Sequence, residues 1–163
     1  MFIARQPIFT ANTKIYGYEL FFRDSAEATK YRGKSSVSST AQVLGNIFEQ
    51  GINTIVGHSK AFVNFDADFI MSEAIELVDP SILVIEILEN VKVNQVLIER
   101  LEQLKKKGFM IALDDFELND NTIHLLNLAD IIKWDILATP LGTLDELVSE
   151  ALKYNKIILA EKV

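Results

Sequence analysis

The sequence predicts an α/β protein whose parallel strands close into a barrel with polar groups gathered at one mouth. One observation is that short apolar runs alternate with amphipathic stretches and are joined by short connections. The other is that several runs lead into an acid, an amide or a lysine: Phe62-Val63 into Asn64, Ile82–Ile85 into Glu86 and Glu89, Met110–Leu113 into Asp114 and Asp115, Ile131-Ile132 into Lys133 and Asp135, and Ile157–Ala160 into Glu161. Because charges at the ends of buried strands are costly unless paired or bound to a cation, we expect these groups to converge.

Composition limits the class of protein and its partners. The chain has 163 residues, 49% of them hydrophobic, which is enough for one core, so residues 1–163 are expected to form a single domain. The net charge of −7 argues against a polymeric nucleic acid as partner. The absence of cysteine excludes disulfides and thiolate zinc sites. Without a recognisable signal peptide or a membrane-spanning apolar run, we expect a cytoplasmic location and no membrane partner.

In the first half of the chain, strands and helices alternate. Lys14–Phe22 reads as a strand, and a second strand leads up to Asn64. Between them, a Ser or Thr at positions 38–40 can cap a helix that ends just before Gly51. Asp68–Val78 is predicted to form one helix, which a proline two residues further on stops.

The second half repeats the alternation more regularly. Four β-branched or apolar runs read as buried strands: Ser81–Leu88, Phe109–Leu113, Ile131–Ile136 and Lys156–Ala160. The predicted helices are Val93–Lys107, Thr122–Leu128 and Leu144–Tyr154. The first of these has an apolar stripe, a basic last turn and a glycine stop, which are typical of a helix end.

The inward strand faces end in polar residues that suit metal chemistry. Residues two apart share a face of a strand, and the inward faces end mostly in acids. Several acids at one mouth repel one another unless cations lie between them, and oxygen-only ligands select hard ions such as Mg²⁺, Mn²⁺ or Ca²⁺. The adjacent Asp114 and Asp115 make two metals plausible, and Lys133 could orient the attacking water. The alternative is ordinary: an Asp-Asp pair can simply cap the next helix, and a Glu at a strand end can simply be solvated.

Several short segments then resemble, in the same order, the motifs of a known family. The segments are Gln6-Pro7-Ile8, Gly17–Arg23, Val63-Asn64-Phe65, Glu86–Glu89, Ala112–Phe116, Ile132–Asp135 and Leu159–Val163. They are similar to motifs of EAL domains, which are cyclic di-GMP phosphodiesterases, and look most like the subfamily in which an HDOD domain follows. The resemblance implies a TIM-type (β/α) barrel that is incomplete here, because this chain reaches only about the sixth barrel strand.

The resemblance also implies roles for individual residues. The expected metal ligands are Glu19, Asn64, Glu86, Asp114 and Asp115. The expected catalytic residues are Glu19, Lys133 and Glu161, and the expected contacts to the dinucleotide are Gln6, Arg23 and Asp135. Two Mg²⁺ or Mn²⁺ ions would support hydrolysis and Ca²⁺ would inhibit it. Cyclic di-GMP is the expected ligand, a homodimer the expected assembly and an HDOD domain the possible C-terminal neighbour in the parent protein.

Departures from the family pattern leave more than one function open. Glu117–Asp120 replaces a glycine loop of the family, Lys162 replaces a glycine, and a later Gln-Gly strand is absent. The leading hypothesis is a metal-dependent phosphodiesterase that opens cyclic di-GMP to linear pGpG, with this fragment less active than its parent. The alternative is a degenerate domain that serves as a cyclic di-GMP receptor or a protein-interaction module. An unrelated metal-dependent barrel enzyme acting on a carbonyl substrate would explain the acids but not Gln6, Arg23 and the ordered motifs.

Overall fold

The computed structural model describes residues 2–23, 51–88, 91–114 and 123–161. The chain folds into two compact units, Met1–Val84 and Ile85–Val163. The expected helix before Gly51 lies outside the described residues, as does Asp115. Within the described ranges, no helix is long and apolar enough to cross a membrane.

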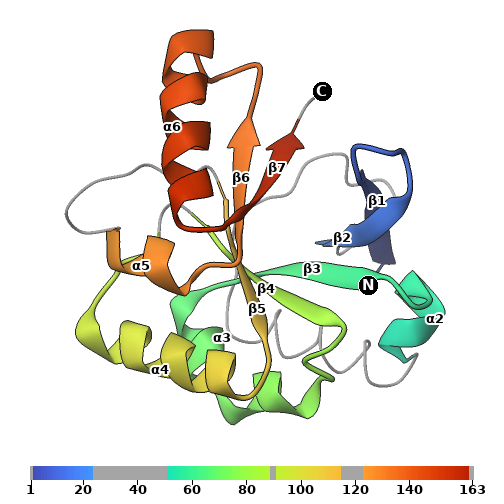
Figure 1. The fold of residues 1–163 in the computed structure, drawn as a ribbon. Helices are drawn as coiled ribbons and strands as arrows, with labels where there is room; N and C mark the ends of the chain where they lie inside the picture. Colours follow the sequence, from blue (N-terminus) through green and yellow to red (C-terminus); the bar gives the residue numbers. More distant parts are fainter. Residues whose placement is uncertain (1, 24–50, 89–90, 115–122, 162–163) are drawn as a thin grey trace. The chain divides into compact units, whose positions relative to one another are not determined.

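The first unit begins with an antiparallel hairpin followed by a parallel strand (Figure 1). β1 (Phe2–Phe9) pairs with β2 (Ile15–Arg23), and the register places Gln6 opposite Glu19. β2 then runs parallel to β3 (Lys60–Phe65), with Gly17 opposite Lys60. Asn64, expected to follow this strand, lies within it. The first barrel strand is therefore preceded by an antiparallel partner, which the apolar pattern alone did not indicate.

Two short helices and one 3₁₀ turn complete the first unit. α2 (Ile52–Val56) begins after Gly51, and α3 (Ala67–Met71) is capped by the Asp66 side chain. The prediction of a single helix over Asp68–Val78 was wrong, because Ser72 is extended and a 3₁₀ segment, η1 (Glu73–Leu77), follows it. Ile70 and Ile75 are both fully buried. In one straight helix, residues five apart would point about 140° away from each other, so the break lets both reach the core.

The second unit alternates strand and helix as predicted, with bounds that differ from the predicted ones by at most three residues. Its elements are β4 (Leu83–Ile87), α4 (Gln95–Lys106), β5 (Met110–Leu113), α5 (Ile123–Leu128), β6 (Ile131–Asp135), α6 (Leu141–Lys153) and β7 (Ile157–Glu161). The first two residues of β4 belong to the first unit. β5, β6 and β7 are parallel neighbours, and the Asp114 N–H donates to the Ile87 carbonyl at 3.0 Å. The carboxyl ends of these strands therefore lie at the same edge of the sheet.

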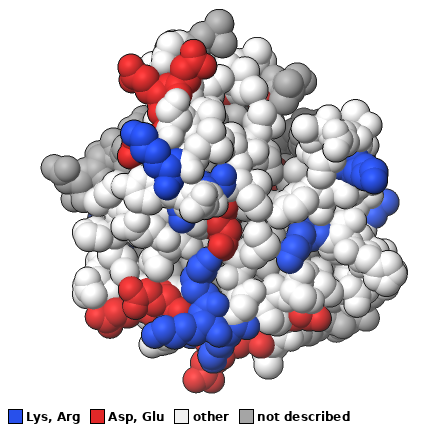
Figure 2. Space-filling view, viewed as in Figure 1, with Lys and Arg blue, Asp and Glu red and all other residues white. Residues whose placement is uncertain are grey.

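The opposite ends of these strands carry a structural polar cluster centred on Asp130. Its two carboxylate oxygens accept from the Lys105 ammonium and, at 2.9 Å, from the Ile111 N–H. Lys156 donates to the Ala129 carbonyl at 2.6 Å. Burial lowers the pKa of Lys156, and the nearby Asp130 opposes that fall. On the face shown in Figure 2, Lys and Arg side chains gather around the C-terminal end of α4, where Lys105 and Lys106 lie in the last turn. These contacts tie α4, β5 and β6 together.

Replacing Asp130 by Asn is therefore expected to destabilise the protein. The variant loses the Lys105 ion pair and presents an amide where two donors point, at a cost of about 1–2 kcal/mol. Chemical denaturation of the variant and the wild type measures this. The control is Glu150→Gln, which removes the partner of an exposed Lys153 one helical turn away and should leave the unfolding midpoint unchanged. An unchanged midpoint for Asp130→Asn as well would contradict the assigned role.

Candidate functional site

The second unit places one polar side chain near the carboxyl end of each of its four strands. Glu86 lies in β4, Asp114 directly follows β5, Lys133 is the third residue of β6, and Glu161 ends β7. The register of β6 against β7 pairs Asp135 with Glu161 and Lys133 with Leu159. Parallel pairing brings these residues to one edge although they are far apart in the sequence.

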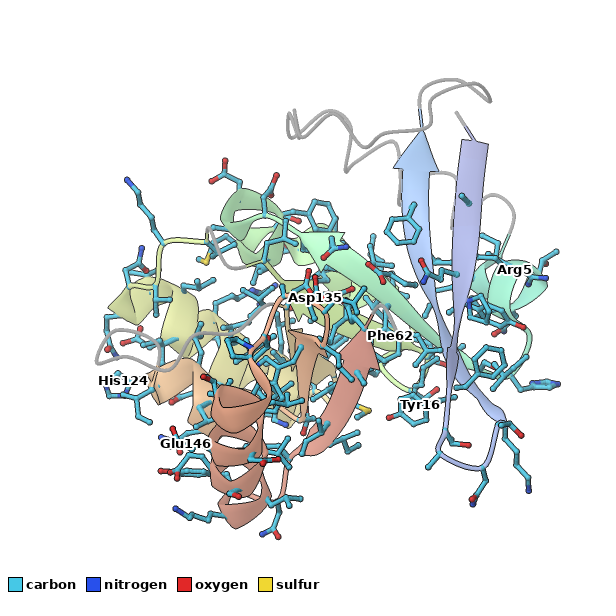
Figure 3. The ribbon with its side chains drawn as sticks, turned by 90° about the horizontal axis from the view of Figure 1, so that it is seen from above. Arg5, Tyr16, Phe62, His124, Asp135 and Glu146 are labelled. Carbon is cyan, nitrogen blue, oxygen red and sulfur yellow. The ribbon has the colours of Figure 1, made fainter. Side chains whose placement is uncertain are left out.

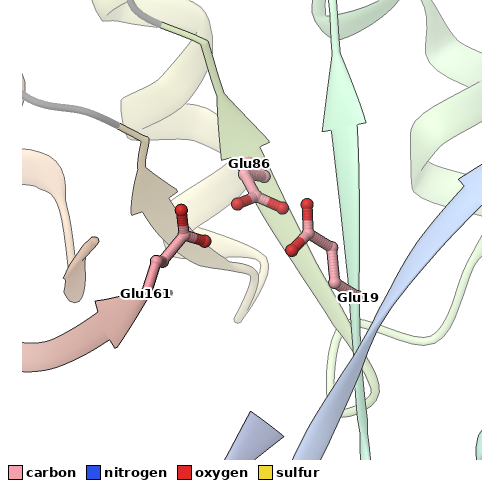
Figure 4. A group of neighbouring side chains, drawn as sticks. All are labelled: Glu19, Glu86 and Glu161. Carbon is pink, nitrogen blue, oxygen red and sulfur yellow. The ribbon is translucent and has the colours of Figure 1, made fainter. Parts of the chain in front are cut away.

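The Lys133 ammonium lies at the centre of this group. It pairs with Glu86 Oε1, with Glu161 Oε1 at 2.6 Å and with Asp114 Oδ1 at 3.1 Å. The side chain of Lys133 is 1% exposed and that of Glu86 is fully buried, whereas those of Asp114 and Glu161 are partly exposed. Glu86 and Glu161 each offer a carboxylate oxygen within 4.8 Å of the other, and Figure 4 shows the two side chains pointing toward each other. We name Glu86, Asp114, Lys133 and Glu161 the lysine–carboxylate cluster.

The first unit holds a separate pair of candidate ligands. Glu19 on β2 and Asn64 on β3 lie on neighbouring strands, and Asn64 Nδ2 donates to Glu19 Oε1 at 3.3 Å. Asn64 Oδ1 is buried and accepts no hydrogen bond from the described residues. A buried amide oxygen without a donor is costly, and a cation is one group that can satisfy it. Gln6 lies opposite Glu19 in the hairpin, so its side chain shares that face of the sheet.

The remaining expected site residues have different outcomes. Asp115 lies outside the described residues, and the side chain of Arg23 is not described either. Asp135, labelled in Figure 3, accepts from the Leu137 N–H at 2.9 Å and the Ala138 N–H at 3.0 Å through Oδ1. That oxygen holds the turn after β6. A contact of Asp135 with the ligand stays a prediction.

The lysine–carboxylate cluster meets the chemical requirements of a hard divalent cation. Its three carboxylates and one ammonium leave a net formal charge of −2 when all are ionised. The donors are oxygens, which Mg²⁺, Mn²⁺ and Ca²⁺ prefer. The orphaned Asn64 Oδ1 in the first unit is a donor of the same kind. The sequence predicts a Lys133 that contacts the attacking water, and it also predicts that acids gathered without a metal are protonated or paired with Lys133 or Arg23. The pairing of Lys133 with three acids is observed.

Comparison with known proteins finds relatives that are longer than this chain. No family model matches. The "uncharacterized protein YuxH" of Bacillus subtilis is 34% identical over 168 residues, covering 100% of this chain and 41% of that protein. The cyclic di-GMP phosphodiesterase CdgJ of Vibrio cholerae is 30% identical over 165 residues, covering 99% of this chain and 38% of that protein. The chain thus spans about two fifths of the length of these curated relatives.

A solved structure supports the fold class that the sequence predicts. The Bacillus subtilis YkuI protein, which has an EAL domain and was solved with cyclic di-GMP and calcium, superposes with a TM-score of 0.75. The match has 22% sequence identity and covers 98% of this chain and 48% of that one. The predicted fold class, an incomplete TIM-type (β/α) barrel, is confirmed.

Proposed function

We propose that this chain, an EAL domain by its motifs and its fold, is the catalytic domain of a metal-dependent phosphodiesterase that opens cyclic di-GMP to linear pGpG. The recognition of an EAL domain from the sequence motifs is confirmed by the fold and by a curated relative that is a cyclic di-GMP phosphodiesterase. The observation that carries the proposal is the lysine–carboxylate cluster, because it gathers carboxylate oxygens and the buried ammonium of Lys133 at the carboxyl ends of parallel strands.

In this proposal, each group of polar residues has a defined task. Glu86 and Asp114 would hold a divalent cation in the second unit, and Glu19 and Asn64 are the oxygen ligands that the first unit would supply to metal. A bound Mg²⁺ or Mn²⁺ ion supplies Lewis-acid activation of water and neutralises phosphoryl oxygens. Lys133 orients the attacking water, and Glu161 accepts a proton from it. Gln6 and Arg23 bind the dinucleotide. Asp115 is assigned to the same metal chemistry on the basis of its motif.

Water attack on a phosphodiester suits these groups for a physical reason. The transition state gains negative charge on the phosphoryl oxygens, and fixed positive charges nearby stabilise it more than they stabilise the substrate. Lys133 brings such a charge on a rigid strand, and its burial strengthens the interaction because little water screens it. In the metal-free protein, the carboxylates around Lys133 hold its ammonium at the site.

A receptor without turnover is the second candidate. The observation that favours it is the segment Glu117–Asp120, which stands where the family has a glycine loop and brings two carboxylates close to Asp114 in the sequence. Carboxylates next to a phosphodiesterase site would oppose the negative charge that develops on the phosphoryl oxygens in the transition state, so they would slow cleavage more than binding. A domain of this kind would bind cyclic di-GMP, or a protein partner, without cleaving it. The homodimer and the HDOD neighbour likewise remain predictions.

Hydrolysis and binding assays distinguish these candidates. We expect the protein to convert cyclic di-GMP to pGpG with Mn²⁺ or Mg²⁺, measured by chromatography of the nucleotides, and to stop when a chelator is added. Calorimetric titration of cyclic di-GMP in Ca²⁺ measures binding separately from turnover. Binding without hydrolysis, also in a chain extended to the length of the relatives, would favour the receptor. If the extended chain neither binds nor hydrolyses cyclic di-GMP, both candidate functions are refuted. The remaining function would then be that of a scaffold for protein partners.

A further inference from the structure

We propose that Lys133 is an internal counter-ion that holds the acids of the lysine–carboxylate cluster together before a metal arrives, so that a divalent cation binds in competition with it. The metal part of this inference rests on the proposed function. The counter-ion part concerns the folded protein alone, and it can be tested in the absence of any metal or nucleotide.

The contacts of Lys133 carry the first step. Its ammonium reaches carboxylates from three other strands, and the partners Glu86, Asp114 and Glu161 are 47, 19 and 28 positions away in the sequence. Since Lys133 is 1% exposed, water contributes little to stabilising its charge. The ammonium and the acids therefore depend on one another: each acid lowers the cost of burying Lys133, and Lys133 suppresses repulsion among the acids.

The second step follows from the shared carboxylates. The Lys133 ammonium contacts Oε1 of Glu86, Oδ1 of Asp114 and Oε1 of Glu161, so a cation held by any of these acids shares a carboxylate with it. Two positive charges on one small group of carboxylates repel each other, so binding of a metal weakens the lysine contacts. Lys133 thus lowers the affinity for metal while it stabilises the metal-free fold. Its long, flexible stem lets the ammonium move aside while its backbone stays in β6.

Four proteins test the counter-ion in chelator: the wild type, Lys133→Met, Glu161→Gln and the double variant. Glu161→Gln removes one partner of Lys133 in the wild-type background, so the melting temperature should fall by several degrees. In the Lys133→Met background the same change removes a repelling charge, so the melting temperature should rise. This reversal of sign is the expected result. Destabilisation of similar size in both backgrounds would overturn the proposal, because Glu161 would then act independently of Lys133.

Calorimetric titration with Mn²⁺ alone tests the competition. Lys133→Met should bind Mn²⁺ about tenfold more tightly than the wild type, equivalent to about 1.4 kcal/mol. The control is Lys105→Met, which removes a lysine paired with Asp130 at the opposite strand ends and should leave Mn²⁺ affinity unchanged. Equal or weaker binding by Lys133→Met would overturn the competition.

A Lys133→Met variant that fails to fold also tests the counter-ion. If Lys133→Met is unfolded in chelator, the proposal requires that Mn²⁺ or the second change Glu161→Gln restores folding. If neither does, Lys133 is needed for packing rather than for charge, and the proposal is wrong. Failure of the proposed function can be distinguished from failure of this inference. A protein that does not hydrolyse cyclic di-GMP should still show the reversal of sign in chelator. Conversely, if the protein hydrolyses cyclic di-GMP but its variants show no reversal, the proposed function stands and this inference is wrong.

Discussion

Replacing Asp114 by Asn is expected to remove most of the stabilisation that a divalent metal gives to the protein. A ligand that binds only the folded state at 100 times its Kd adds about 2.7 kcal/mol, a rise in melting temperature of roughly 5–10 °C for a chain of this size. Asp114 follows β5 and is partly exposed, so it offers an oxygen that a metal can reach. The asparagine amide has nearly the same shape as the Asp114 carboxylate but carries no negative charge. Thermal melts with and without millimolar Mg²⁺ or Mn²⁺ measure the loss.

The same substitution should lower hydrolysis of cyclic di-GMP by roughly 10²–10³-fold, because a site that stabilises charge in the transition state loses one of its anchors. Asp145→Asn is the matched control, since Asp145 is exposed on α6 and the change removes the same charge outside the cluster. That variant should keep the metal response and the activity of the wild type. A wild type that shows no thermal shift at millimolar metal would count against a working metal site.

Replacing Gly17 by Val is expected to cause a large loss of stability. A Cβ at this position would lie 2.7 Å from the Lys60 carbonyl oxygen and 2.9 Å from a ring carbon of Phe62. The first contact is with the backbone of the neighbouring parallel strand, which cannot move aside without disturbing the pairing of β2 and β3. The fully buried Phe62 also packs against Tyr16, with ring centroids 6.1 Å apart (Figure 3). We expect a cost of about 3 kcal/mol, the upper part of the range for overpacking.

Denaturant unfolding measures this cost, and a second glycine provides the control. A Cβ at Gly142, in the first turn of α6, would have no atom within 4 Å. Gly142→Ala should therefore stabilise the protein by about 0.5–1 kcal/mol, because alanine loses less backbone freedom in a helix. If Gly17→Val and Gly142→Ala had equal effects, the close approach of β2 to β3 would not be the reason for Gly17.

The periodicity of apolar residues, and the residues that begin and end helices and strands, made much of the second unit predictable. The helix expected over Val93–Lys107 is observed as α4 over Gln95–Lys106, with Asn94 as its cap. The strand expected over Ile131–Ile136 is observed as β6 over Ile131–Asp135. These segments agree because local rules and tertiary packing favour the same structure there. The helix over Asp68–Val78 failed because the burial of Ile75 outweighed helical continuity.

The sequence by itself determined which residues could form a site and which strands would carry them. Alternation placed Glu86, Asp114 and Glu161 at strand ends, and ordered motifs indicated their chemistry. Only the tertiary structure decided that the Lys133 ammonium lies among these three acids, and that Asp135 Oδ1 holds a turn. The physical reason is distance along the chain: Lys133 and Glu86 are 47 residues apart, and their contact depends on the sheet order β4-β5-β6, in which one strand separates theirs. Local patterns carry no information about such contacts, whereas strand pairing creates them.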